Sequence, residues 1–313
     1  MTNRFKTHEW KSDSWASVDF YNRWFMASAP EAFKTARKGV MNDVLSVFKK
    51  LDYLRNIDVD TVKAAPEIMQ VIRACTAPPL ALERLSGLAL TKRGLLQRME
   101  EGKLPLKISS EELSLEIEKV LSIIRSLLDV DIFPWLKSGK EPSLQAVNRS
   151  ASIVSDRLTG SLCDPIIRNA QEERQLKAID DFLTQKGYRY IVPKNITSPE
   201  SMPPLTFSHH FNIPERIADK VVNMPIDVVI QTANSKFPLL IECKSAGDFT
   251  NTNKRRKEEA VKSLQLQQTY GENVNLILFL CGYFDVTYLG YEAAEGIDWV
   301  WENRISDFEQ FGV

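Results

Sequence analysis

Two apolar runs separated by a polar turn mark the C-terminal third of the chain. Residues 227–231 (DVVIQ) and 239–241 (LLI) are apolar and rich in β-branched side chains, and small polar residues fill the segment between them. This pattern predicts an antiparallel β-hairpin. In that hairpin Asp227, at the start of the first strand, would lie beside Glu242, at the end of the second.

Helical patterns surround the predicted hairpin. One helix begins at Asp164-Pro165, a capping aspartate followed by a proline suited to the first turn, and ends at Lys186-Gly187. Another follows the hairpin and stops at Gly271, and the apolar run 275–280 (NLILFL) reads as a buried strand. The order helix, hairpin, helix, strand predicts an α/β fold with a mixed sheet flanked by helices.

The first 150 residues have almost entirely helical patterns. Residues 110–128, for example, begin with a serine cap and acidic residues, and their apolar positions recur at helical spacing. A connector rich in Gly, Pro and charge lies at residues 137–142. We therefore expect a helical domain at 1–140 and an α/β domain at 141–313.

The hairpin carries residues suited to phosphodiester hydrolysis. On a strand, Glu242 and Lys244 share one face and Cys243 points to the other. Asp227 and Glu242 offer the hard oxygen ligands that Mg²⁺ prefers, and the backbone carbonyl of Cys243 could add another. Lys244 could orient or deprotonate the attacking water. Asp227, Glu242 and Lys244 thus form the candidate catalytic set.

The sequences Pro225-Ile226-Asp227 and Glu242-Cys243-Lys244 together resemble the P-[ILV]-D…E-x-K motif of the PD-(D/E)xK nuclease superfamily. From about residue 152 to the C-terminus the chain is similar to the XamI group of type II restriction endonucleases. The resemblance implies a helical N-terminal region that helps to recognise DNA or to dimerise, followed by a restriction-endonuclease-like core. It also implies Mg²⁺-dependent cleavage of double-stranded DNA at a short palindrome, leaving 5′-phosphate ends. A homodimer would match the symmetry of such a site.

The same resemblance nominates a further acidic residue on the helix before the hairpin. Glu172 lies four residues before Leu176 and so shares the apolar face, whereas Glu173 points about 100° away. The superfamily often places a metal-binding acid here, which makes Glu172 a candidate ligand. The alternative is a glutamate favoured near the helix N-terminus by the helix dipole.

Three groups are candidate DNA contacts. Lys254, Arg255 and Arg256 follow the motif and could bind phosphates, although Glu258 and Glu259 come directly after them and favour a solvated helix start. On the same helix, two glutamines recur at helical spacing with apolar residues, and the resemblance suggests contacts near the site; a solvated edge is the alternative. These are Gln265 and Gln268.

The third group lies in the helical region. Two short helical segments are separated near Ser86-Gly87, and the second, residues 91–98, carries Lys92 and Arg93. This pattern fits a helix-turn-helix loosely and an ordinary helical hairpin better.

Composition narrows the class of protein. Forty basic and forty-one acidic residues give a net charge of −1, which argues against a strongly basic DNA-coating protein. Four cysteines without C-x-x-C spacing predict reduced thiols in a cytoplasmic protein, and the lack of a long apolar run predicts no membrane segment. The alternatives to a restriction enzyme are a repair or recombination nuclease with the same core, a non-catalytic DNA-binding regulator, and a helical interaction protein with an accidental motif.

Overall fold

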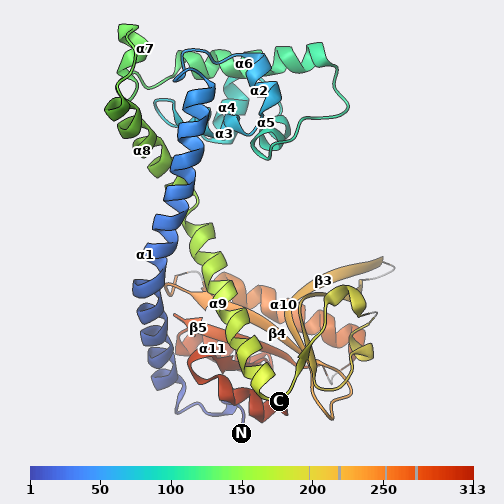
Figure 1. The fold of residues 1–313 in the computed structure, drawn as a ribbon. Helices are drawn as coiled ribbons and strands as arrows, with labels where there is room; N and C mark the ends of the chain where they lie inside the picture. The colour runs from blue at the N-terminus through green and yellow to red at the C-terminus, as the bar shows by residue number, and fades with distance from the viewer. Residues whose placement is uncertain (197, 218–219, 251, 272–273) are drawn as a thin grey trace. The chain divides into compact units, whose positions relative to one another are not determined.

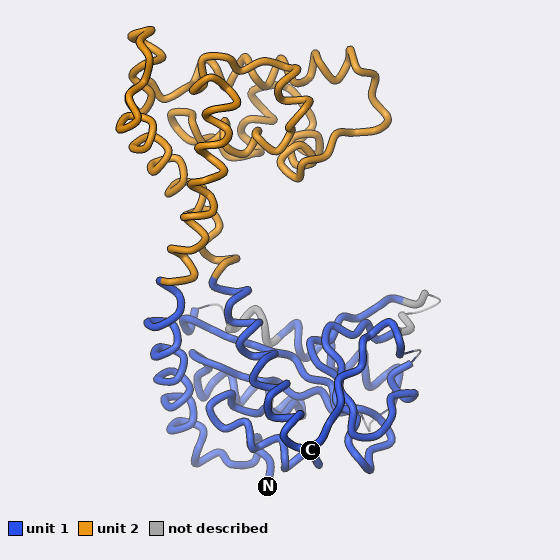
Figure 2. Tube along the Cα trace, in the orientation of Figure 1, with its two compact units in different colours: residues 1–30, 167–313 blue, residues 31–166 orange. Residues whose placement is uncertain are grey.

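The computed structural model describes residues 1–313 except 197, 218–219, 251 and 272–273, and it describes only the backbone of 215–217, 220–221 and 252–256. The chain divides into two compact units (Figure 2). Unit 1 comprises residues 1–30 and 167–313, and unit 2 comprises residues 31–166. The boundaries fall within two long helices, α1 (Trp10–Lys50) and α9 (Cys163–Gln185).

This division differs from the predicted boundary at residue 140. The connector at 137–142 follows a short helix of unit 2, where Gly139 adopts a positive φ of 69°, and another helix of the same unit follows it. It is therefore a turn between two helices. The first 30 residues, in turn, belong to the α/β unit.

Unit 2 is entirely helical, as the pattern of the first 150 residues predicts. Ser109 caps one of its helices by accepting a hydrogen bond from the backbone of Glu112. Besides the end of α1, its helices are α2 (Val59–Ala64), α3 (Ile68–Ala74), α4 (Leu82–Leu88), α5 (Arg93–Glu100), α6 (Ser110–Ser126), α7 (Pro134–Ser138) and α8 (Leu144–Ser161).

Unit 1 is built on a six-stranded mixed sheet in the order β1-β2-β3-β4-β5-β6. Strands β2, β3 and β4 are antiparallel neighbours, whereas β4, β5 and β6 run parallel. The elements are β1 (Arg189–Tyr190), β2 (Thr206–Ile217), β3 (Lys220–Gln231), β4 (Leu239–Ala246), α10 (Thr252–Tyr270), β5 (Leu276–Gly282), α11 (Val286–Ala294) and β6 (Asp298–Trp301). The 3-10 turns are η1 (Asn3–Phe5), η2 (Pro193–Asn195), η3 (Pro199–Ser201) and η4 (Glu302–Phe311).

Helices cover both faces of this sheet (Figure 1). On one face Ile179 and Leu183 of α9 pack against Val228 of β3 and Ile241 of β4. On the other face Leu266 of α10 packs in a cluster with further residues of β3 and β4, while α11 and Trp10 cover β5 and β6. The predicted α/β fold, with a helical N-terminal region and a mixed sheet flanked by helices, is confirmed.

Two further features are the state of the cysteines and the length and apolarity of the helices. All four cysteines are free thiols, and Cys75 and Cys281 are buried. Within the described part of the chain, no helix is both long and apolar enough to cross a membrane.

Candidate active site

The predicted hairpin is present, and it opens at the candidate catalytic residues. Val229 pairs with Leu240 and Val228 with Ile241, and the ladder between β3 and β4 ends there. The next residues along the strands are Asp227 and Glu242. The backbone N–H of Cys243 donates a 2.8 Å hydrogen bond to Oδ2 of Asp227, which holds this carboxylate against β4.

The strand alternation shifts at Asp227. Ile226 and Val229 belong to one core cluster although they are three positions apart, and Val228 belongs to the cluster on the opposite face. On β2, His210 adopts a positive φ of 49° at the corresponding position. Such a local irregularity re-aims a side chain that a regular strand would pack into a core layer.

Burial and a neighbouring charge act together on Asp227. Burial raises the pKa of Asp227, the negative charge of Glu242 raises it further, and the hydrogen bond from Cys243 partly offsets both. Two carboxylates are therefore held close together in a poorly solvated place. A cation bound between them would relieve their repulsion.

Lys244 lies between two acidic side chains. Its Nζ is 3.2 Å from Oε2 of Glu242 and 3.5 Å from Oε1 of Glu259, a residue of α10. Burial alone would lower the pKa of Lys244, but the two carboxylates outweigh burial and raise it. Lys244 is thus held as an ammonium by its protein neighbours, which favours orienting water or stabilising negative charge over deprotonating water.

The faces of β4 are as predicted. Glu242 and Lys244 both interact with residues of α10, whereas Cys243 packs against the cluster under α9. Burial raises the pKa of the Cys243 thiol well above its ordinary value. The side chain of Cys243 is therefore a core group, and its backbone is the part that contacts the site.

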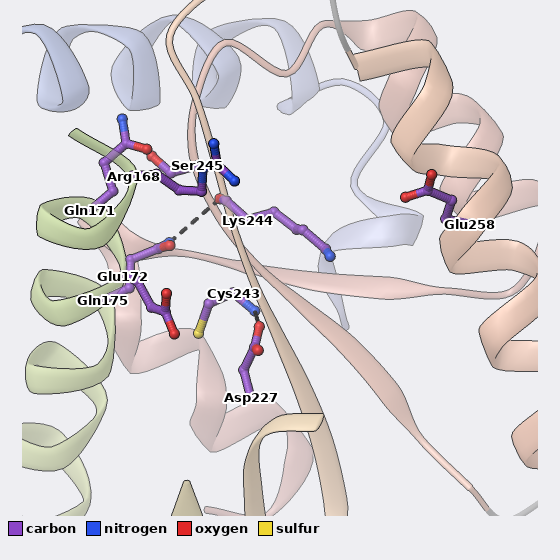
Figure 3. A pocket seen from close by; sticks show the side chains of 9 residues that line it. All are labelled: Arg168, Gln171, Glu172, Gln175, Asp227, Cys243, Lys244, Ser245 and Glu258. Carbon is purple, nitrogen blue, oxygen red and sulfur yellow. Dashed lines mark hydrogen bonds between the residues drawn. The ribbon is translucent and has the colours of Figure 1, made fainter. Parts of the chain in front are cut away.

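A cavity of about 290 Å³ lies at the open end of the hairpin, and Figure 3 shows it between α9 and α10. Asp227 and Glu172 point into it from opposite sides of Cys243 (Figure 3). The lining residues are Arg168, Gln171, Glu172, Gln175, Asp227, Cys243, Lys244, Ser245 and Glu258. Most of these side chains are polar or charged, which suits a charged substrate better than an apolar ligand.

Helix α9 presents the face that its periodicity predicts. Glu172 lines the cavity, whereas Glu173 is exposed. Oε1 of Glu172 lies 3.8 Å from Nε2 of His210, so this histidine of strand β2 lies beside the site.

The sequence pattern does not single out Gln175, a buried residue of this helix. Gln175 is 2% exposed and donates a 3.1 Å hydrogen bond to the carbonyl of Phe279. Its position three residues after Glu172 was the available signal, because that spacing puts both side chains on neighbouring parts of one helix face.

Helix α10 differs from the predicted phasing. The apolar residues that recur at helical spacing with Gln265 and Gln268 are Val261 and Leu264, and they are 54% and 56% exposed. The buried face instead carries Glu259, Ser263 and Leu266. The exposed apolar pair produced a misleading pattern, and Gln268 is exposed. The side chains of Lys254, Arg255 and Arg256 lie outside the described residues.

In unit 2, Lys92 and Arg93 lie at the start of α5, which follows α4 as a short helical pair. Lys92 is exposed and lines a cavity of about 690 Å³. Nε of Arg93 is 2.8 Å from Oε1 of Glu83, so an intramolecular ion pair engages its guanidinium.

The donor set fits a hard divalent cation. Asp227 provides carboxylate oxygens at the polar cavity, and Glu242 is a second, buried carboxylate whose charge acts on Asp227. Among the described residues, however, no three His, Cys, Asp or Glu side chains gather closely enough to form a complete metal-binding group. Mg²⁺ commonly completes such sparse sites with water and substrate phosphate.

The sheet, flanked by helices, opens at a carboxylate pair with an adjacent lysine, which is the arrangement that the resemblance to PD-(D/E)xK nucleases leads us to expect. The family model for the XamI restriction endonuclease matches residues 52–301. The type II restriction enzyme SalI of Streptomyces albus G is 45% identical over 316 residues, which cover 100% of both chains. The chain therefore belongs to the XamI restriction endonuclease family. It is a type II restriction endonuclease, a site-specific endodeoxyribonuclease.

A weaker likeness concerns a solved structure, the crystal structure of protein VC1899 from Vibrio cholerae. It covers 78% of this chain and 54% of that chain, at 15% identity and a TM-score of 0.28. The chain thus spans about half the length of that protein, and a score this low carries no inference.

Proposed function

We propose that this restriction endonuclease hydrolyses double-stranded DNA at the open end of the β3–β4 hairpin, with Mg²⁺ held by Asp227 and Glu242. The observation that carries the proposal is the convergence of these two carboxylates with Lys244, whose Nζ lies 3.2 Å from Glu242. Restriction endonucleases generally use divalent metal ions, and oxygen ligands of this kind favour Mg²⁺ among them.

Each residue has a separate task in the proposed reaction. A bound Mg²⁺ would neutralise phosphate charge and acidify a water. The hydrogen bond from the backbone N–H of Cys243 fixes Asp227 in position to bind the metal ion. The backbone carbonyl of Cys243 would be a further ligand, and Glu172 of α9 would supply another carboxylate from the opposite side of Cys243 (Figure 3). Lys244, as an ammonium, orients the water and stabilises charge on the phosphate oxygens. The products are a 5′-phosphate and a 3′-hydroxyl.

DNA binding would extend beyond this cavity. Arg168 adds a guanidinium to the lining. Lys254, Arg255 and Arg256 stay candidates for phosphate contacts because they lie in the first turns of α10. The same helix carries Glu258, which lines the cavity, and Glu259, which contacts Lys244. Gln265 and Gln268 on α10, and Lys92 and Arg93 at the start of α5, stay candidates because each has a polar side chain that is exposed or partly exposed. A two-fold homodimer would match a palindromic site.

The family rules against the rival classes. The chain matches the XamI family model over residues 52–301 and is 45% identical to a restriction enzyme over 100% of its length, which favours neither a repair nuclease with the same core nor a non-catalytic regulator. Neither alternative is favoured.

Digestion of a sequenced plasmid tests the proposal. The purified full chain should cut it into discrete fragments with Mg²⁺ and stop cutting in excess EDTA. Ca²⁺ should support binding without turnover. Asp227→Ala should lose more than about a hundredfold in rate, since even residues that merely orient metal ligands cost up to that much.

The fragment sizes on the same gel locate the cleavage sites in the known plasmid sequence and so identify the recognised sequence. A parallel digest with SalI of Streptomyces albus G shows whether the two enzymes share a site. A smear would contradict site specificity, and undiminished cutting in EDTA would contradict the metal mechanism.

A further inference from the structure

A second lysine, Lys262 of α10, contacts the candidate metal ligand Glu242. Its Nζ donates hydrogen bonds to Oε1 of Glu242 and to the carbonyl of Pro225, the latter 2.5 Å long. The side chain of Lys262 is 17% exposed and that of Glu242 is 6% exposed. This is a partly buried ion pair at the centre of the site, and the sequence motif does not include it.

The two oxygens of Glu242 are thus divided between two ammonium groups. Lys244 contacts Oε2 and Lys262 contacts Oε1. A buried carboxylate without partners is costly, so these contacts explain how Glu242 is tolerated at this burial. They also mean that a divalent cation approaching Glu242 meets ammonium groups already on both oxygens.

The two lysines differ in what else holds them. Lys244 has a second carboxylate partner, Glu259, and Figure 3 shows its side chain pointing toward α10. The second partner of Lys262 is a neutral backbone carbonyl. Of the two cations, Lys262 is therefore the less strongly retained by charge, and its flexible four-carbon chain lets it withdraw.

We propose that Lys262 is a resident counter-cation of Glu242, which holds this carboxylate in position and competes with the divalent metal ion for it. The inference rests on the proposed metal role of Asp227 and Glu242. Lys262 then sets how tightly the metal binds: a cation that reaches Glu242 must displace Lys262 from Oε1. Lys244 stays on Glu242 and Glu259 and keeps its place beside the reacting phosphate.

The charge balance gives the direction of the effect. Three carboxylates, those of Asp227, Glu242 and Glu259, face the two lysines in this site. Without the charge of Lys262 the site is more negative by one unit. A unit positive charge several ångströms from a divalent cation repels it. Even in water this repulsion weakens the binding constant of the cation by about a factor of ten. Loss of Lys262 should therefore tighten metal binding at least about tenfold.

Calcium titration calorimetry on the full chain without DNA tests this, because it needs no turnover. Lys262→Gln should bind Ca²⁺ at least about tenfold more tightly than the wild type, and Lys262→Arg should bind it like the wild type. Lys257→Gln removes one exposed lysine from the same helix and is the matched control, expected to change affinity by less than about twofold. Unchanged or weaker binding by a folded Lys262→Gln would overturn the proposal.

A measurement on the wild type guards against a misfolded variant. The side-chain NMR signal of Lys262, assigned by its loss in Lys262→Arg, should move in step with Ca²⁺ saturation. A signal that stays fixed through saturation would also overturn the proposal. Glu242→Ala distinguishes failure of the proposed metal site from failure of the proposed role of Lys262. If this variant binds Ca²⁺ as well as the wild type, the proposed metal site itself is wrong, whatever Lys262 does.

Discussion

The two units of the chain treat buried polar groups differently. In unit 2 the buried polar residues are all serines and threonines, such as Ser155 and Thr159, which donate to carbonyls four residues earlier on their own helix. In the described part of unit 1, six acidic residues are buried, and unit 2 has none. They are Glu242, Glu259, Glu292, Asp298, Glu302 and Asp307.

This difference separates the source of stability from the site of chemistry. The core of unit 2 is a continuous apolar cluster, which needs no compensation for buried charge. Each buried carboxylate of unit 1 costs free energy unless it is paired or neutral. Glu242 and Glu259 are paired with lysines, and these lysines lie at the candidate site. Unit 1 thus holds buried charges at the candidate site, at a cost in free energy that the apolar core of unit 2 avoids.

The largest effect should come from removing the lysine at the centre of unit 1. Lys244→Ala should lower the single-turnover cleavage rate by more than about a hundredfold, while DNA affinity in Ca²⁺ stays within a few-fold, because its charge acts mainly in the transition state. Lys63→Ala is the control in unit 2, since Nζ of Lys63 only bridges Ser110 and Ser114 there. Wild-type cleavage by Lys244→Ala would refute the assignment of the catalytic strand.

The sequence predicted the hairpin and the placement of its polar residues because both depend on short-range patterns. Alternation places Glu242 and Lys244 on one face, and turn residues between apolar runs bring Asp227 beside them. The start of α9 and the strand β5 were predicted for the same reason. Each of these features is set by residues close together in the chain.

Partners from distant elements could not be predicted in this way. Lys262 and Glu259 reach Glu242 and Lys244 from α10, whose apolar residues Val261 and Leu264 face outward and mislead any assignment of its buried face. The unit boundaries were missed because they fall inside continuous helices, where no glycine-rich or polar connector marks them.

A smaller effect should separate two adjacent glutamates of α9. Glu172→Ala should slow cleavage about tenfold, the effect typical of groups that support a metal site, and Glu173→Ala should change it less than twofold. The reason is orientation, because Glu172 lines the cavity and Glu173 is exposed. Single-turnover rates of both folded variants measure the order. If Glu173→Ala proves more damaging, Glu172 does not serve the site.

Unit 2 should show its contribution in binding alone. Lys92→Ala should weaken DNA binding a few-fold and lower the salt dependence by about one counterion, with an unchanged cleavage rate at saturating enzyme. Arg93→Ala should change affinity less, because its guanidinium is paired with Glu83. Gel-shift titrations in Ca²⁺ at two salt concentrations distinguish them. Equal salt slopes for Lys92→Ala and the wild type would remove α5 from the DNA interface.

The smallest effect concerns stability and tests the cost of buried acids in unit 1. Glu292 is 1% exposed, and burial together with the nearby Glu259 raises its pKa from 4.5 to about 8. Between these pH values the folded protein keeps a proton that the unfolded chain releases, so this group makes the free energy of unfolding fall as pH rises from 4.5 toward 8.

Glu292→Gln removes this dependence. Its Tm should exceed that of the wild type at pH 8, by about 2–4 °C for each kcal/mol regained, and the difference should shrink toward pH 5. Glu111→Gln, an exposed glutamate of unit 2, is the control and should show no such trend. Parallel Tm curves for Glu292→Gln and the wild type across this range would mean that Glu292 carries no such cost.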